Sequence, residues 1–312
     1  MLSGHLWTIV PTLKERMTAL PVAAGKPWTL SIQDRDNTSV DLHGIFHDVG
    51  GDTLVIVVHG LGGSPHARYI KHGTQALLDR GLSCLRLGLR GSHRQGNGIY
   101  HAGLTSDIHA AIADMPQFQR ILLLGYSMGG HTCALATLDP QLDPRVAAVA
   151  ALCSPLDMVT AQQHMDAPKQ WLYRRHVLQG LREIYTSAST THTLPSNSDT
   201  VKTLQRFHQY DALVIAPHFG FDSPEDYYQQ CSLTGRADQL PIPLLAVGVR
   251  TDPMIPVSAI EAGIEGHKNV TAWYLDQGGH CYFPQGTTTD IVDWLMQQRP
   301  SPTLEHRQRT RK

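Results

Sequence analysis

The sequence predicts an α/β fold in which helices cover both faces of a mostly parallel central sheet. Short apolar runs, typical of buried strands, alternate along the chain with stretches of helical periodicity. Two of these runs lead into glycine-rich turns, where the backbone can turn sharply at a strand end. The alternation breaks once, between Pro155 and Leu240. This break predicts a helical lid inserted over the strand ends.

Each predicted strand is an apolar or alternating run bounded by turn residues. In chain order the strands are expected over residues 28–34, 40–47, 54–58, 82–87, 121–125, 146–152, 244–249 and 270–275. Helices are expected between them over residues 67–80, 104–115, 128–138, 257–264 and 290–298. An N-terminal arm precedes the first strand.

The chain is expected to form one core with one insertion. Residues 1–156 and 241–299 supply the two parts of the core, and residues 157–240 form the lid. Residues 300–312 are expected to be a disordered tail, as basic chain ends usually are. With 312 residues and 41% hydrophobic content, the chain can bury a large core without a partner.

Within the lid, apolar residues recur at helical spacing at Trp171, Leu178, Leu181 and Tyr185. This pattern predicts a helix that buries one face, and Trp171, Leu178 and Phe219 are candidates for the substrate-binding pocket. A helix lying on a membrane surface is the alternative, so peripheral membrane contact stays open. Further candidates for an apolar acyl pocket are Met158, Phe207, Phe221, Tyr227 and Tyr228.

The stretch from Ile121 to Gly130 reads as an apolar strand, a G-x-S-x-G turn and the start of a helix. This is the arrangement of a nucleophile elbow, in which Gly125 and Gly129 must lack side chains for the turn to close. The positive end of the following helix points at Ser127, where negative charge would develop during acyl transfer. A tight strand-to-helix turn with a surface serine is the alternative.

The predicted strand over residues 54–58 ends in the loop His59-Gly60-Leu61-Gly62-Gly63. Because glycines let the backbone approach a ligand closely, we expect the N–H groups of Leu61 and Met128 to form an oxyanion hole. We interpret His59 as a structural residue that hydrogen-bonds the loop. A phosphate-binding loop is disfavoured, since no Lys-Ser/Thr pair follows the glycines.

An acid and a histidine follow two later strands, in the chain order that a nucleophile elbow requires. Asp252 comes directly after the strand over residues 244–249, and His280 lies on a glycine-rich loop after the last strand. Asp276 is the rival acid, but it is too near His280 along the chain to orient the ring from the opposite side. We therefore predict a catalytic triad of Ser127, Asp252 and His280.

Composition excludes several other function classes. A net charge of −1 gives no basic excess for binding nucleic acid. No apolar run approaches the ~20 residues of a membrane span, and no signal-peptide pattern opens the chain. An odd number of cysteines, five, without a C-x-x-C pair indicates reduced thiols and a cytoplasmic protein. His43 and His47 lack the acidic partner of a zinc motif, so no metal or other cofactor is expected.

These motifs resemble the alpha/beta-hydrolase superfamily. A finer set of matches resembles its YheT-like branch, the AB hydrolase 4 family, which includes bacterial esterases and eukaryotic membrane-anchored lipid hydrolases and acyltransferases. The resemblance runs from about Ser3 to Trp294. The matching segments are Gly4 to Pro11, His59 to Ser64 with His66 to Tyr69, Arg90-Gly91, Tyr100 to Gly103, Phe219 to Phe221 and Asp226 to Tyr228.

Three residues near these motifs have no catalytic role in this interpretation. His131 stands where many relatives have asparagine, and we expect it to cover the surface of its own helix. Asp107 is expected to be a cap or loop anchor, because it opens a predicted helix. Arg90 is expected to tie loops together.

The sequence therefore predicts a serine hydrolase that cleaves small carboxylic esters, including lipid or medium-chain acyl esters, through an acyl-enzyme. An acyltransferase that uses the same acyl-enzyme is the nearer alternative. A non-catalytic binding protein on a hydrolase scaffold is the more distant one. Neither the native ester nor the oligomeric state follows from the sequence.

Overall fold

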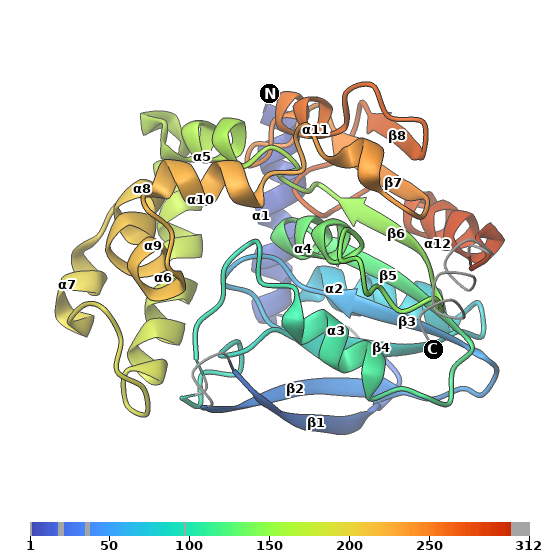
Figure 1. Cartoon of the computed structure of the whole chain (residues 1–312). Coiled ribbons are helices and arrows are strands. Elements are labelled where there is room, and N and C mark those ends of the chain that lie inside the picture. Colours follow the sequence, from blue (N-terminus) through green and yellow to red (C-terminus); the bar gives the residue numbers. More distant parts are fainter. Residues whose placement is uncertain (1, 18–21, 35–37, 97, 301–312) are drawn as a thin grey trace.

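The computed structural model describes residues 2–17, 22–34, 38–96 and 98–300. The strands of the described chain form one sheet in the order β1-β2-β4-β3-β5-β6-β7-β8 (Figure 1). Their bounds are Lys26–Gln33 for β1, Ser39–His47 for β2, Thr53–Val58 for β3, Ser83–Gly88 for β4, Arg120–Tyr126 for β5, Val146–Leu152 for β6, Leu244–Val249 for β7 and Val270–Leu275 for β8.

The sheet is parallel except at one edge, where β2 runs antiparallel to both β1 and β4. From β4 across to β8 every pair is parallel. The carboxyl ends of β3, β5, β7 and β8 therefore meet at one edge, where α/β sheets carry their functional residues. All of the predicted strands are present, with bounds within two residues of those expected.

Helices cover both faces of the sheet, because the strand residues alternate between two apolar clusters. In β3, Leu54, Ile56 and Val58 face one cluster, and Val55 and Val57 face the other. The first cluster includes residues of α3 (Ser106–Ala113), α4 (Met128–Ala136) and α11 (Val257–Ile264), and the second includes residues of α2 (Arg68–Leu78) and α12 (Thr287–Gln297). The α/β fold class predicted from the sequence is confirmed.

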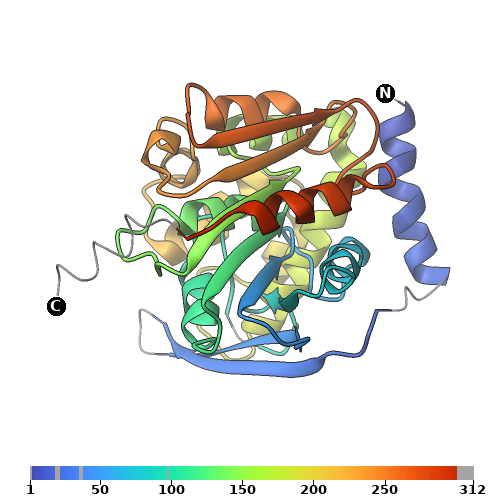
Figure 2. The ribbon, with the colours of Figure 1, turned by 90° about the vertical axis from the view of Figure 1, so that its right-hand side faces the viewer.

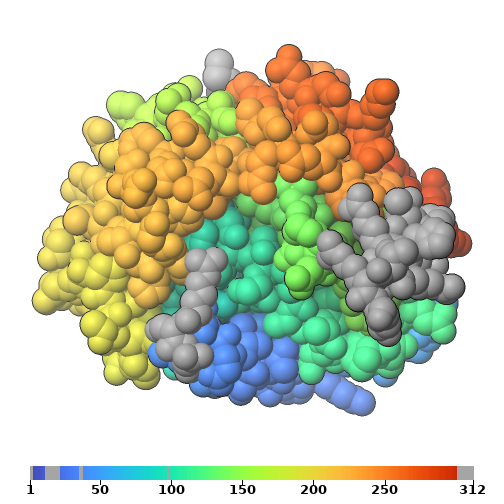
Figure 3. Space-filling model, viewed as in Figure 1, coloured from blue at the N-terminus to red at the C-terminus, as the bar shows by residue number. Residues whose placement is uncertain are grey.

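A long run of helices lies between β6 and β7. It comprises α5 (Met158–Asp166), η1 (Pro168–Gln170), α6 (Trp171–Ala188), α7 (Ser198–Thr203), α8 (Phe207–Tyr210), the π-helix η2 (Asp211–Ile215), α9 (Ala216–Phe219), α10 (Pro224–Cys231) and η3 (Ala237–Gln239). Figure 1 shows α5 to α10 gathered at one side of the sheet, and Figure 3 shows their atoms as a continuous mass there. The boundaries proposed for a lid over residues 157–240 stay a prediction.

The N-terminal segment differs from the expected arm. It is a helix, α1 (Leu2–Met17), and Figure 2 shows it lying along one side of the molecule. Pro11 does not end this helix, although a proline inside a helix removes one backbone hydrogen bond. A lone segment of this kind forms mainly because its neighbours pack against it, which local sequence does not reveal.

Two other expectations bear on the ends of the chain and on membranes. The predicted disordered tail over residues 300–312 falls almost entirely on residues 301–312, which lie outside the described residues. Within the described ranges, none of the helices combines the length and the apolar character that a membrane span needs.

Candidate active site

Ser127 lies in a strained turn between β5 and α4. Its backbone angles, φ 53° and ψ −128°, belong to a region that non-glycine residues rarely adopt. A Cβ on Gly125 would lie 2.3 Å from the Cα of Gly130, and one on Gly129 would lie 2.4 Å from the carbonyl oxygen of His59. The turn can therefore close only with glycine at these positions, as expected for a nucleophile elbow.

The loop after β3 is held in place by two tyrosines. The N–H of Gly60 donates to the hydroxyl of Tyr69 at 3.1 Å, and the N–H of Gly62 donates to the hydroxyl of Tyr100 at 2.8 Å. Between them, the N–H of Leu61 donates to no acceptor in the described chain. Such an N–H is available to an oxygen of a ligand.

The backbone N–H of Met128 is available for the same reason, because it is the first residue of α4 and has no acceptor within the helix. Both Leu61 and Met128 line the same cavity as Ser127. The two expected donors of an oxyanion hole are thus in one site with the expected nucleophile.

His59 is structural, as predicted. It is fully buried, and its Nε2 accepts the N–H of Leu89 at 3.2 Å. Its Nδ1 therefore carries the proton and donates to the carbonyl of Gly60 at 2.8 Å. Burial lowers the pKa of His59 to about 4, so the ring stays neutral at pH 7.

The acid and the histidine predicted for the triad lie in direct contact. Nδ1 of His280 is 2.9 Å from Oδ2 of Asp252, and the side chain of Asp252 is 1% exposed. Oδ1 of Asp252 accepts the N–H groups of Met254 and Ile255 at 2.8 and 3.1 Å. Burial alone would lower the pKa of His280, but the Asp252 carboxylate and Cys281 hold it well above the usual value.

The rival acid points elsewhere. The side chain of Asp276 is 88% exposed and pairs with Arg250, with 3.2 Å between Oδ1 and Nε. The structure thus brings Asp252, and not Asp276, to His280. The hydroxyl of Ser127 makes no hydrogen bond within the described residues, and catalytic hydrogen bonds in unliganded sites are often long.

One set of side chains in the described chain has the spacing of a metal site. Ligand atoms of Cys153, Asp252 and His280 lie within 4.8 Å of one another. The Asp252 oxygen and the His280 nitrogen are already joined by a hydrogen bond. A proton, rather than a metal ion, fits between two atoms 2.9 Å apart.

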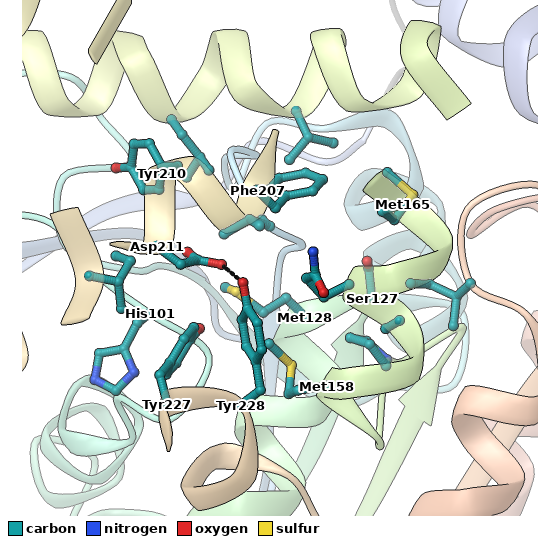
Figure 4. A pocket seen from close by; sticks show the side chains of 18 of the residues that line it. His101, Ser127, Met128, Met158, Met165, Phe207, Tyr210, Asp211, Tyr227 and Tyr228 are labelled. Carbon is teal, nitrogen blue, oxygen red and sulfur yellow. Dashed lines mark hydrogen bonds between the residues drawn. The ribbon is translucent and has the colours of Figure 1, made fainter. Parts of the chain in front are cut away.

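A largely apolar cavity extends from Ser127 under the helices between β6 and β7 (Figure 4). Four of the residues that the sequence suggested for an acyl pocket line it: Met158, Phe207, Tyr227 and Tyr228. The three residues predicted for substrate binding do not line it. Trp171 is 57% exposed, Leu178 is packed in the core, and Phe219 packs at a tilt against the ring of His101.

This difference has a simple origin in the helical face of α6. The pocket-facing residues of α6 are Val177 and Leu181, while Leu178 packs into the core. Neighbouring positions of a helix point about 100° apart, so spacing alone does not tell which part of a broad apolar stripe faces a cavity.

The three residues for which we expected no catalytic role all make structural contacts. Arg90 is 1% exposed and bonds both Asp107 and Asp34, so it ties loops together as expected. Asp107 is buried and accepts the main-chain N–H of Arg90 at 2.9 Å, as a loop anchor does. The expectation for His131 is wrong, because its ring is fully buried and lies 2.6 Å from the carbonyl oxygen of Cys231.

Sequence reasoning missed the role of α1. A Cβ on Gly4 would lie 1.8 Å from the carbonyl oxygen of Thr251, and one on Gly279 would lie 2.5 Å from Oγ1 of Thr8. His5 Nδ1 lies 2.6 Å from the hydroxyl of Tyr173 on α6. The helix thus packs closely against the loops of Asp252 and His280. The matching segment from Gly4 to Pro11 was the available signal, but it carried no assigned role.

The comparisons with known proteins identify the family of this chain. A family described as the alpha/beta hydrolase fold matches residues 53–287. The chain belongs to the alpha/beta-hydrolase family. This alpha/beta hydrolase is 26% identical over 306 residues to "Putative esterase YheT" of Escherichia coli, covering 95% of this chain and 88% of that protein.

This alpha/beta hydrolase is also similar to a yeast protein and to an esterase of known structure. It is 22% identical over 259 residues to "Medium-chain fatty acid ethyl ester synthase/esterase 2" of Saccharomyces cerevisiae, covering 73% of this chain and 57% of that protein. The esterase Pf2001 of Pyrococcus furiosus has a similar fold, with a TM-score of 0.56 and 17% identity over 90% of this chain and all of that one. The predicted likeness to YheT is confirmed, and the relatives support a hydrolase.

Proposed function

We propose that this alpha/beta hydrolase is a serine esterase that cleaves carboxylic esters through an acyl-enzyme intermediate. The observation that carries the proposal is the buried pair of Asp252 and His280, in the same fold as a serine on a strained elbow. Family membership supports hydrolase chemistry, and the ester specificity is our inference.

In this mechanism Ser127 Oγ attacks the acyl carbonyl while His280 takes its proton. Asp252 holds Nδ1 of His280 protonated, which leaves Nε2 free to act as the base. The N–H groups of Leu61 and Met128 stabilise the negative oxygen of the tetrahedral intermediate. His280 then returns the proton to the leaving alcohol, and water repeats the sequence on the acyl-enzyme.

The cavity supports esters with an apolar acyl chain. Its lining is dominated by methionine and aromatic side chains, including Met158, Met165 and Phe207. Flexible thioethers adapt to alkyl chains, and aromatic rings offer large apolar surfaces. The name of the yeast relative, which refers to medium-chain fatty acid esters, is consistent with such a substrate.

An acyltransferase that passes the same acyl group to an alcohol is the second candidate. The same yeast name favours it, because it describes a synthase as well as an esterase. We further propose a cytoplasmic location, which the free thiols of the five cysteines support.

The test is turnover of p-nitrophenyl acyl esters by the purified protein, with and without added ethanol. We expect release of free acid in water, and Ser127→Ala should lose turnover. Ethyl ester as the main product at low ethanol would identify the acyltransferase. No turnover of any ester in the panel, with a folded protein, would favour the non-catalytic binding protein.

A further inference from the structure

A carboxylate lies in the wall of the apolar cavity. Asp211 lines the cavity, is 9% exposed, and accepts the hydroxyl of Tyr228 at 2.6 Å through Oδ2. Figure 4 shows this pair on one side of the cavity and Ser127 on the other. Among the described residues, Oδ1 of Asp211 has no hydrogen-bond partner.

Among the described residues, Asp211 forms no ion pair with a lysine or arginine side chain. The charged groups that act on it are Asp166, another acid, and His208, whose ring is 2.7 Å from Glu225. Because burial disfavours the charged form, the pKa of Asp211 is raised to about 7. Burying an acid without a cation costs stability, so an apolar residue would serve a merely structural wall better.

The backbone at Asp211 is also unusual. Asp211 is the first residue of the π-helix η2, which interrupts the helical run between α8 and α9. A π-turn carries an extra residue and is frequently found at functional sites. Here it coincides with the entry of a carboxylate into the cavity wall.

When Asp211 is ionised, its free oxygen accepts hydrogen bonds and cannot donate one. Among the lining residues it is the one carboxylate, and its neighbours there include Tyr210, Ile215 and Tyr227. An ammonium group would lose its hydration here, with a single carboxylate in the lining to balance its charge. A carboxylate on the ligand would be repelled. A hydroxyl needs one strong acceptor and suits the site.

We propose that Asp211 is a specificity-determining residue that recognises a hydroxyl group on the acyl chain of the ester. The inference rests on the proposed esterase function and names its substrate class as hydroxyacyl esters. Tyr228 holds the carboxylate in place through its own hydroxyl, and the apolar lining between Ser127 and Asp211 accommodates the alkyl part of the chain.

The test compares p-nitrophenyl esters of terminally hydroxylated acids with plain alkyl esters of the same length, from butanoyl to dodecanoyl. Lengthening the chain moves the hydroxyl away from the carbonyl, so one length should place it at Asp211. At that length, and at pH 8, above the pKa of Asp211, we expect the hydroxyacyl ester to have a kcat/KM about 10-fold to 100-fold above its alkyl partner, as a hydrogen bond to a charged group allows.

Variants assign that preference to the residue. At the preferred chain length, Asp211→Leu should reduce the ratio of kcat/KM for the hydroxyacyl ester to kcat/KM for the alkyl ester until it equals the ratio at the other chain lengths. Tyr228→Phe should lower this ratio in part. Because both esters are measured on the same protein, any change in general activity cancels. Asp199→Leu, on an exposed side chain of α7, is the control and should keep the wild-type ratio.

Failure of the two proposals can be told apart. Wild-type protein that hydrolyses the alkyl esters but prefers no hydroxyacyl ester at any length overturns the role of Asp211 and leaves the esterase intact. If the protein turns over none of the esters, calorimetric titration with free hydroxylated and plain fatty acids still tests whether Asp211 recognises the hydroxyl group. Equal affinity for both at every length would then reject it.

Discussion

The hydroxyl of Thr8 accepts a hydrogen bond from the main-chain N–H of His280 at 2.9 Å, across 272 positions of the chain. Oγ1 of Thr8 also donates to the carbonyl of Gly4 at 2.8 Å, which fixes its direction. The first helix of the protein therefore holds the loop that carries the proposed catalytic base.

This contact predicts that Thr8 acts as a positioning residue. Thr8→Val keeps the shape of the side chain and removes the acceptor, so the loop of His280 should lose its anchor. We expect kcat for a short ester to fall about 10-fold, with a smaller change in KM, since misplacement of a catalytic group affects the chemical step. Thr8→Ser should restore most of the activity. Equal loss in the valine and serine variants would contradict a role through this hydrogen bond.

The contact between Asp252 and His280 predicts which acid matters. Asp252→Asn should lower kcat by about 10⁴, because an amide favours the wrong tautomer of the histidine. Asp276→Asn is the matched control, since its side chain faces solvent and pairs with Arg250. Steady-state kinetics on one ester decide the matter. A larger loss in the Asp276 variant would mean that the acid is misassigned.

The close packing of α6 on the loop after β3 predicts a sensitive glycine. A Cβ on Gly180 would lie 2.5 Å from the carbonyl oxygen of Gly62, next to Leu61 in the proposed oxyanion hole. Gly180→Ala should force the two backbones apart, lower the free energy of unfolding by about 1–3 kcal/mol and reduce kcat. Gln179→Ala, on the exposed side of the same helix, should do neither. Denaturant unfolding and ester turnover measure both effects.

Two buried histidines predict how stability depends on pH. Burial lowers the pKa of both His59 and His131 to about 4, so both stay neutral in the folded protein. Between pH 6.5 and about 4 the unfolded chain binds protons that the folded protein excludes. Their contribution to stability is therefore complete above pH 6.5 and is lost as the pH falls through this range.

His131→Asn removes one of these groups. The drop in the free energy of unfolding between pH 7 and pH 5 should then shrink by about 2 kcal/mol, following ~1.4 kcal/mol per pH unit for one proton below pH 6.5. Urea unfolding at the two pH values gives the comparison. An unchanged drop would show that His131 already takes up a proton in the folded state.

Local sequence was sufficient to predict those parts of the structure that one local physical cause determines. Buried strands such as β6 and β7 begin and end where their apolar runs do, and the G-x-S-x-G turn needs its glycines for steric reasons visible in the sequence. The order of acid and histidine pointed to Asp252 and His280.

The features that the sequence did not predict depend on contacts between residues far apart in the chain. The helix α1 runs through Pro11 and packs on distant loops, and His131 is buried by α10, which is remote in sequence. In the sequence Asp211 only ends a polar run that begins at His208, and only the folded π-helix places it in the cavity wall.

The proposed nucleophile can be tested by its covalent chemistry. Incubation with a fluorophosphonate, followed by mass spectrometry of the intact protein and of its peptides, should show one adduct per chain, located on Ser127. Folded Ser127→Ala should remain unmodified under the same conditions. An adduct on another residue, or equal labelling of wild type and Ser127→Ala, would contradict the assignment of Ser127 as the nucleophile and with it the proposed mechanism.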